Sequence, residues 1–292
     1  MSYLNRLYQS VVIIKKNWKI LIPSLYSLFV TILLSLAFLY INGLLSLLVR
    51  DPSDLFVSGG ISVLTKKLSS VLLSQSQIIK ISLTFIGFFI VNFLAGSSLL
   101  AMKYCMINDA LKNERVSLRK GFREGVSYYF KIVEMRISVF VLMIILSLII
   151  GLPLYILSKY FGNTMFLILT GVVLILLFVN LILLFRFPVM IRKQIKPVEA
   201  LNECLGLFKS KTKEISIVFG ISLLIMISAV TFFEYFRLII SDYLYSYSGL
   251  YIILLGFYLM KEVFMRIFNS ISDVFIFISY FKLQPQENLQ HT

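Results

Sequence analysis

The sequence predicts an all-α polytopic membrane protein. We expect about six transmembrane helices in three hairpins, each preceded by a short amphipathic helix at the cytoplasmic surface. The chain is 59% hydrophobic and 14% charged, with a mean hydropathy of +0.91, whereas soluble domains carry roughly a quarter charged residues. Uncharged runs cover residues 20 to 49, 81 to 102, 137 to 158, 160 to 185, 215 to 233 and 243 to 260. Because about 20 apolar residues cross a hydrocarbon core, most of these runs are long enough to span it.

The basic residues predict the orientation. Twenty of the 28 lysines and arginines lie in residues 1 to 19, 103 to 136, 186 to 213 and the C-terminal tail, which are alternate connections between the runs. Cytoplasmic connections carry such an excess. We therefore expect a multi-pass protein of the cell membrane with both termini in the cytoplasm. A basic groove interleaved with aromatic residues is missing, so nucleic acid is not an expected partner.

The expected spans lie in one transmembrane domain over residues 1–292. They are residues 20–46, 79–106, 136–158, 163–190, 214–238 and 252–282. The first run is too long for a removable signal, whose apolar region has about 7 to 15 residues. From Gly249 to Lys282 no proline occurs, which favours one long helix over a seven-span alternative split near Lys261. The role of the outer segment 50–77 stays open.

Three basic connections, which we call elbows, carry apolar residues at helical spacing. The stripes are Leu4, Leu7, Val11 and Ile14 in the first elbow; Leu118, Phe122, Val126, Tyr129 and Val133 in the second; and Val198, Leu201, Leu205 and Phe208 in the third. Each elbow precedes a span within about twenty residues, as expected for repeats of one unit. We therefore predict three pseudo-repeats, at about 1–108, 117–192 and 196–283.

Two elbows carry short motifs. These are Phe187-Pro188 with Pro197-x-Glu199-Ala200-Leu201, and Ser117-x-x-x-Gly121-Phe122-x-x-Gly125. Together with the overall architecture they resemble a six-helix membrane domain, found fused to some glycerophosphodiester phosphodiesterases and as stand-alone, mostly uncharacterised prokaryotic proteins. In the fused proteins catalysis belongs to a separate soluble domain, so the resemblance implies no active site in this chain.

The elbows are the first candidate functional surface. Their candidate residues for contact with lipid headgroups or a partner are Lys15, Lys16, Arg119, Lys120, Arg123, Arg192, Lys193, Lys209, Lys211 and Lys213. A basic residue near an anionic membrane contributes about 1 kcal/mol of attraction, so anionic lipid is the expected ligand. The alternative is that these residues only fix the topology.

A second candidate is a polar cluster within the membrane. It comprises Asp273, Arg266, Glu262, Glu234 and Arg237. Ionised groups in a span usually face a cavity or a partner, and we expect Asp273 to be buried. For the other four residues, the alternative is that the long helix protrudes and leaves them in water outside the membrane. Lys103 and Arg186, near span ends, are expected to reach the headgroups, and Asn92 and Asn180 to form hydrogen bonds between helices.

Catalytic chemistry is not predicted. His291 is the only histidine, Cys105 and Cys204 are the only cysteines, and no phosphate-binding glycine loop occurs. We expect no catalytic, cofactor or metal site. The leading hypothesis is a non-catalytic scaffold or subunit of a membrane complex, bound to anionic lipid and to another membrane or cytosolic protein. The alternatives are a transporter or channel using Asp273, Arg266 and Glu234, and a membrane enzyme acting on lipid.

Overall fold

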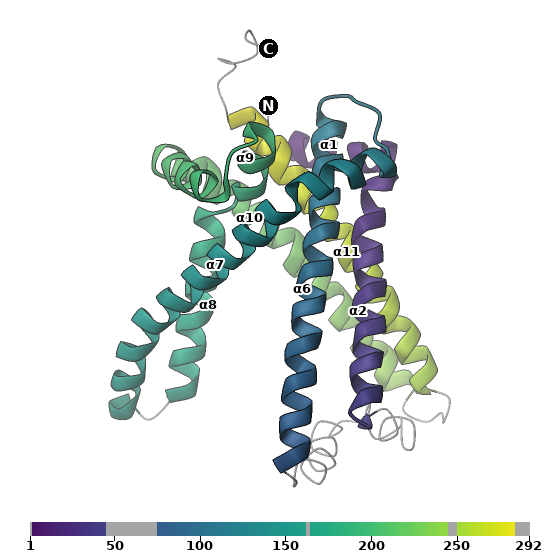
Figure 1. Ribbon diagram of the computed structural model, residues 1–292, viewed down its shortest axis with the longest axis vertical. Helices are drawn as coiled ribbons and strands as arrows, with labels where there is room; N and C mark the ends of the chain where they lie inside the picture. The colour runs from purple at the N-terminus through teal and green to yellow at the C-terminus, as the bar shows by residue number, and fades with distance from the viewer. Residues whose placement is uncertain (1, 45–74, 162–163, 245–249, 284–292) are drawn as a thin grey trace. The chain divides into compact units, whose positions relative to one another are not determined.

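The computed structural model describes residues 2–44, 75–161, 164–244 and 250–283, and in those ranges it consists of helices joined by short turns and connections (Figure 1). The elements are α1 (Tyr3–Lys16), the 3₁₀ turn η1 (Trp18–Ile20), α2 (Leu21–Ile41), α6 (Gln75–Leu111), α7 (Leu118–Phe161), α8 (Thr164–Ile182), α9 (Arg186–Lys193), α10 (Pro197–Leu244) and α11 (Leu250–Leu283). No strand occurs in the described ranges, so the predicted all-α class is confirmed.

Six of the described helical segments are long and apolar enough to cross a membrane. They are Trp18–Ile41, Ser76–Leu111, Leu118–Pro153, Leu169–Lys193, Pro197–Ile240 and Gly256–Leu283. This agrees with the predicted multi-pass class and with the number of expected spans. Residues 50–74 of the outer segment 50–77 and residues 162–163 lie outside the described residues, whereas residues 75–77 begin α6.

The elbows end in three different ways. α1 stops at Asn17, whose backbone N–H and side-chain amide both donate to Ile13 O, and η1 then leads into α2. In α10, Lys211 has non-helical dihedrals (φ −135°, ψ 38°) and separates the elbow from the span. α7 runs from its elbow into its span without a break and continues past Pro153. The second elbow is therefore part of a longer helix and not a separate short one.

α11 decides between one long C-terminal helix and the seven-span alternative split near Lys261. It is one helix from Leu250 to Leu283 and passes through Lys261 and Glu262 without interruption. A break there would need a turn residue, and residues 257–268 contain no glycine, proline, asparagine, aspartate or serine. The expected single helix is confirmed, and the seven-span alternative is wrong at this point.

The chain forms two compact units. The first, which we call the elbow unit, comprises Met1–Ile20, Leu100–Ile225 and Ser270–Thr292, and the second comprises Leu21–Leu99 and Met226–Asn269. All three elbows fall in the elbow unit, although they are far apart in the sequence. Long helices such as α6 and α11 contribute one end to each unit.

The core of the elbow unit is built around α9. Residues 187 to 191 of this short helix are all buried, and Gln194 closes it with a left-handed φ of 57°. The Phe187 ring lies 4.8 Å from that of Tyr104 in α6, which in turn lies 5.4 Å from the ring of Phe277 in α11. Aromatic side chains thus join three helices at one place.

Two glycines let α7 approach α6 closely. A Cβ atom on Gly121 would lie 2.5 Å from Met106 Cγ, and one on Gly125 would lie 2.9 Å from the backbone nitrogen of Met102. Small residues four apart are a common solution for close helix contacts in membranes. The glycines of the second elbow motif therefore have a packing role.

In the second unit, polar and aromatic contacts join consecutive spans. Thr31 of α2 donates to Asn92 Oδ1 of α6 at 3.1 Å, which confirms the interhelical bond expected for Asn92. The Phe38 ring of α2 lies 6.0 Å from that of Phe88 in α6. Between the other two spans of this unit, the Phe233 ring of α10 lies 5.6 Å from that of Phe264 in α11.

Candidate functional site

Asp273, which was expected to be buried, is half-buried, and its carboxylate has a cationic partner in another helix. Lys103 Nζ of α6 lies 2.5 Å from Asp273 Oδ2 of α11, and their side chains are 7% and 22% exposed. The expectation that Lys103 reaches the headgroups is wrong, because its ammonium group is turned inward to a carboxylate. An ionised group inside a protein needs such a partner, since burial removes its hydration.

Further polar groups surround the pair. The Tyr104 hydroxyl donates to Asp273 Oδ1 at 3.5 Å, and Arg186 and Arg136 are close enough to act electrostatically on Tyr104. Arg186 also donates to Leu183 O at 3.1 Å and to Asn180 Oδ1 at 3.4 Å. Asn180 therefore bonds to α9 and to its own helix, where its amide donates to Leu176 O.

The predicted intramembrane cluster divides between the two units. Glu234 pairs with Arg237, at 2.8 Å, and with Lys261, all in the second unit. Glu262 is exposed and Arg266 half-buried. Asp273 belongs instead to the elbow unit, with Lys103. Sequence reasoning missed Lys103 as its partner, although a lysine next to an apolar run was a usable signal.

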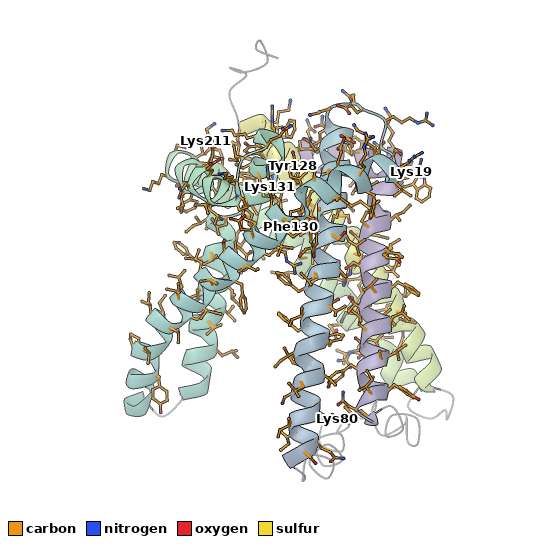
Figure 2. All side chains as sticks on the ribbon, in the orientation of Figure 1. Lys19, Lys80, Tyr128, Phe130, Lys131 and Lys211 are labelled. Carbon is orange, nitrogen blue, oxygen red and sulfur yellow. The ribbon has the colours of Figure 1, made fainter. Side chains whose placement is uncertain are left out.

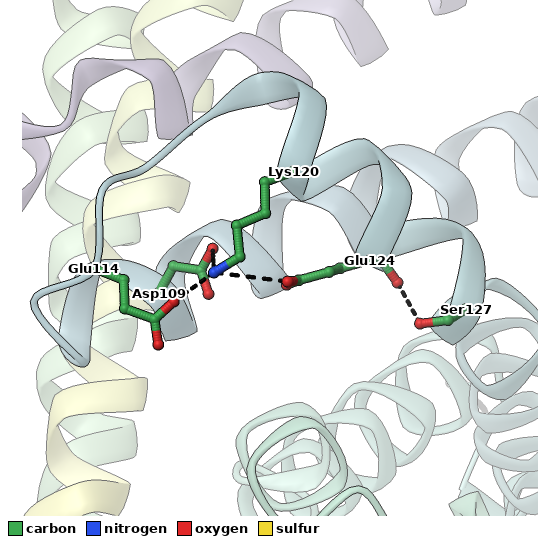
Figure 3. A network of polar contacts seen from close by, with 5 residues as sticks. All are labelled: Asp109, Glu114, Lys120, Glu124 and Ser127. Carbon is green, nitrogen blue, oxygen red and sulfur yellow. Dashed lines mark hydrogen bonds and ion pairs between the residues drawn. The ribbon is translucent and has the colours of Figure 1, made fainter.

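Some of the ten candidate lysines and arginines of the elbows, which we call the collar residues, are already engaged within the protein. Lys120 lies between three carboxylates, pairing with Glu114, with Asp109 Oδ2 at 3.2 Å and with Glu124 Oε1 at 3.6 Å (Figure 3). The Lys120 ammonium group lowers the pKa of Glu114. The nearby Ser127 hydroxyl donates to Glu124 O at 2.7 Å. This network fixes the start of α7 against the end of α6.

Three other collar residues also have partners. Lys193 pairs with Glu203, Lys211 donates to Leu283 O, and the Arg192 guanidinium lies 3.8 Å from the centre of the Phe281 ring. The last two contacts hold the C-terminal end of α11 in the elbow unit. These side chains stabilise the fold and have less freedom to bind a ligand.

The remaining collar residues lie open on the surface. They are Lys15, Lys16, Arg119, Arg123, Lys209 and Lys213, and all six are exposed. No carboxylate of the described residues lies within 4.0 Å of their charged groups. Each elbow thus carries uncompensated positive charge.

Large apolar side chains are exposed on the same elbows. They are Leu4, Tyr8 and Val11 in α1; Phe122, Val126 and Phe130 in α7; and Val198 and Leu205 in α10. Phe130 is 79% exposed, whereas its neighbours Tyr128 and Lys131 bond to the backbone of α9 and the residue after it (Figure 2). Exposed apolar residues at helical spacing beside basic ones are typical of helices at a membrane surface.

The described residues contain no group of three or more His, Cys, Asp or Glu that could hold a metal ion. Comparison of the chain with family models, with curated proteins and with solved structures finds no match. The resemblance to the six-helix membrane domain therefore stays a prediction.

Proposed function

We propose that this protein is a non-catalytic scaffold or subunit of a membrane complex in the cell membrane, with its elbows forming a basic cytosolic collar that binds anionic lipid headgroups. One observation carries the proposal. Each elbow exposes large apolar side chains next to basic side chains whose charge is not neutralised by the described residues. Apolar side chains insert at the boundary of the acyl chains while lysine and arginine attract the headgroups.

The proposed topology follows the same logic. Consecutive spans are in contact within each pair: α2 with α6, α7 with α8, and α10 with α11. Three hairpins would return each elbow to one side of the membrane. The excess of lysine and arginine in the elbows assigns that side, and both termini, to the cytoplasm.

The buried ion pair supports a structural role for the spans. Asp273 is neutralised by Lys103, so its charge needs no bound solute to compensate it. We therefore prefer a scaffold to a transporter. Loss of solute flux in a folded Asp273→Asn variant reconstituted in liposomes would contradict this preference.

Lipid binding can be tested on the full chain in nanodiscs of phosphatidylcholine with increasing phosphatidylglycerol. Four exposed collar residues are replaced together: Arg119→Glu, Arg123→Glu, Lys209→Glu and Lys213→Glu. Since each cation contributes about 1 kcal/mol, the variant should enrich far less phosphatidylglycerol around itself, measured by mass spectrometry of retained lipid. Lys80 is exposed and lies near the N-terminal end of α6, outside the elbow unit. The control variant Lys80→Glu should therefore behave like the unmodified chain.

Equal enrichment of the two lipids by the unmodified chain would reject the collar. The orientation has a separate test, because both native cysteines are buried and give little background labelling. An impermeant maleimide added to intact cells should label Gln77→Cys and leave Lys112→Cys unlabelled; the opposite pattern would reverse the topology. Both replaced side chains are exposed and lie near opposite ends of α6.

A further inference from the structure

A half-open pocket of about 560 Å³ lies where the end of α1 meets the connection from α6 to α7. Both lining segments belong to the elbow unit. The side chains that matter here are Lys16, Lys19 and Arg115, with Trp18 and Val12. The volume is within the range of sites that hold small molecules, about 300 to 1,000 Å³.

The pocket is electropositive. Its lining includes three cations and a single carboxylate, that of Glu114, whose ion pair is made with Lys120. In the described chain, none of the three cations has a carboxylate within 4.0 Å. A group with two or three negatively charged oxygens would match this lining, and arginine can donate two parallel hydrogen bonds to a phosphate.

The backbone around the pocket is held in place. Asn113 adopts a left-handed conformation (φ 59°), and the Glu114 N–H donates to Asp109 O at 3.0 Å, closing the turn that presents Arg115. Val116, 5% exposed, anchors the connection on its other side. On the α1 side, Asn17 caps the helix and Ile20 is fully buried. The cations therefore project from fixed segments.

The position of the pocket favours a lipid as the source of the phosphate. Trp18 begins one candidate span, and Leu111, just before the connection, ends another. Trp18 is 59% exposed and Val12 is also exposed, so the pocket has an apolar rim beside its cations. Tryptophan prefers the boundary between headgroups and acyl chains.

From this geometry we infer a discrete site for the phosphate-bearing headgroup of one anionic phospholipid, with Lys16, Lys19 and Arg115 around the phosphate and Trp18 against the glycerol and upper acyl region. The inference rests on the proposed lipid-binding collar but goes further. The collar attracts many lipids weakly, whereas the pocket holds one molecule in a saturable way.

Trp18 provides the measurement, because it is the only tryptophan of the chain. The full chain is placed in nanodiscs of phosphatidylcholine, and phosphatidylglycerol with brominated acyl chains is added in increasing proportion. Bromine quenches tryptophan fluorescence only at short range. Quenching of Trp18 should saturate at a low proportion of the anionic lipid, whereas brominated phosphatidylcholine should quench only in proportion to its amount.

The test variant is Lys19→Gln with Arg115→Gln, and the control is Lys80→Gln with Lys282→Gln, two exposed lysines outside both the collar and the pocket. Both remove two positive charges, but only the first pair lines the pocket. Half-maximal quenching of the test variant should need about thirtyfold more brominated phosphatidylglycerol, because two cations that contribute about 1 kcal/mol each are lost. The control should shift only slightly. If the test variant does not fold, the single variant Arg115→Lys replaces it. Because this variant keeps the charge, its shift in half-maximal quenching should be larger than that of the control and smaller than the shift expected for the test variant.

The outcomes separate the two proposals. Equal shifts in both double variants would reject the pocket and leave the collar intact. No preference of the unmodified chain for either brominated lipid would reject the pocket, and equal lipid retention in the collar experiment would reject the collar as well. If inorganic phosphate at millimolar concentration relieves the quenching, the site binds a soluble anion and the lipid assignment is wrong.

Discussion

The two halves of α11 differ sharply although they form one helix. From Ser270 to Leu283 the helix lies in the elbow unit, and its Phe275, Phe277 and Tyr280 side chains are almost completely buried. From Gly256 to residue 269 it lies in the second unit, and Leu259, Met260, Val263 and Phe264 are all exposed. In a membrane protein such exposed apolar residues face lipid.

The ionised groups of the two halves differ in the burial of their partners and not in their own: the side chains of Asp273 and Lys261 are 22% and 17% exposed. In the buried half, Asp273 pairs with Lys103, whose side chain is 7% exposed. In the exposed half, Lys261 pairs with Glu234, whose side chain is 38% exposed and which also pairs with Arg237. Both halves thus contain a pair of a lysine and a carboxylate, but the two pairs have different roles. In the elbow unit the pair is a requirement of burial, while in the second unit Glu234 already has a second partner.

The largest effect is expected at the buried pair. Asp273→Ala or Lys103→Met alone should reduce the free energy of unfolding by about 3 to 5 kcal/mol, because each leaves the other charge buried without its partner. The double variant Lys103→Met with Asp273→Leu should recover more than half of the loss. Unfolding in mild detergent with added denaturant measures all three. A double variant as unstable as the singles would show that the charges themselves are needed.

A smaller effect is expected from packing. Gly125→Ala should destabilise the elbow unit by about 1 to 3 kcal/mol, because the new methyl group would meet the backbone of Met102, which cannot move aside easily. Gly256→Ala in the exposed half of α11 is the matched control, since nothing lies within 4 Å of its Cβ position. It should be neutral or stabilise by up to about 1 kcal/mol through helix propensity. Equal destabilisation by both substitutions would remove the packing difference between the units.

The sequence predicted the membrane class and the approximate spans because these depend on composition and run length. It did not predict that Lys103 pairs with Asp273, since 170 positions separate them in the chain and only tertiary packing brings them together. It also did not predict α9: the expected span 163–190 includes Phe187 and Pro188, which lie instead in a separate, buried helix. Lys120 was predicted to belong to the collar because one of its partners, Asp109, lies in a different helix, α6. Only Glu124 is a neighbour of Lys120 within α7.

Hydrogen bonding in the buried half should contribute less than its packing. The Ser222 and Ser272 hydroxyls bond to each other between α10 and α11, and both residues are buried. Replacing both by alanine should cost about 0.6 kcal/mol, the usual value for such bonds within membranes. The single Ser272→Ala variant should cost at least as much, because it leaves Ser222 without this partner. A loss of several kcal/mol in the double variant would mean that the hydroxyls stabilise more than their own contact.

The smallest effect is expected at Glu234. Its side chain is more than one third exposed, so solvent screens its interactions with Lys261 and Arg237, and exposed pairs contribute about 0 to 1 kcal/mol. Glu234→Gln should therefore lower the free energy of unfolding by no more than about 0.5 kcal/mol, measured in the same detergent and denaturant as Asp273→Ala. The amide keeps the size of the side chain, so the comparison isolates the charge. A loss as large as that of Asp273→Ala would show that the exposed half of α11 is covered by protein, and the contrast between its two halves would fail.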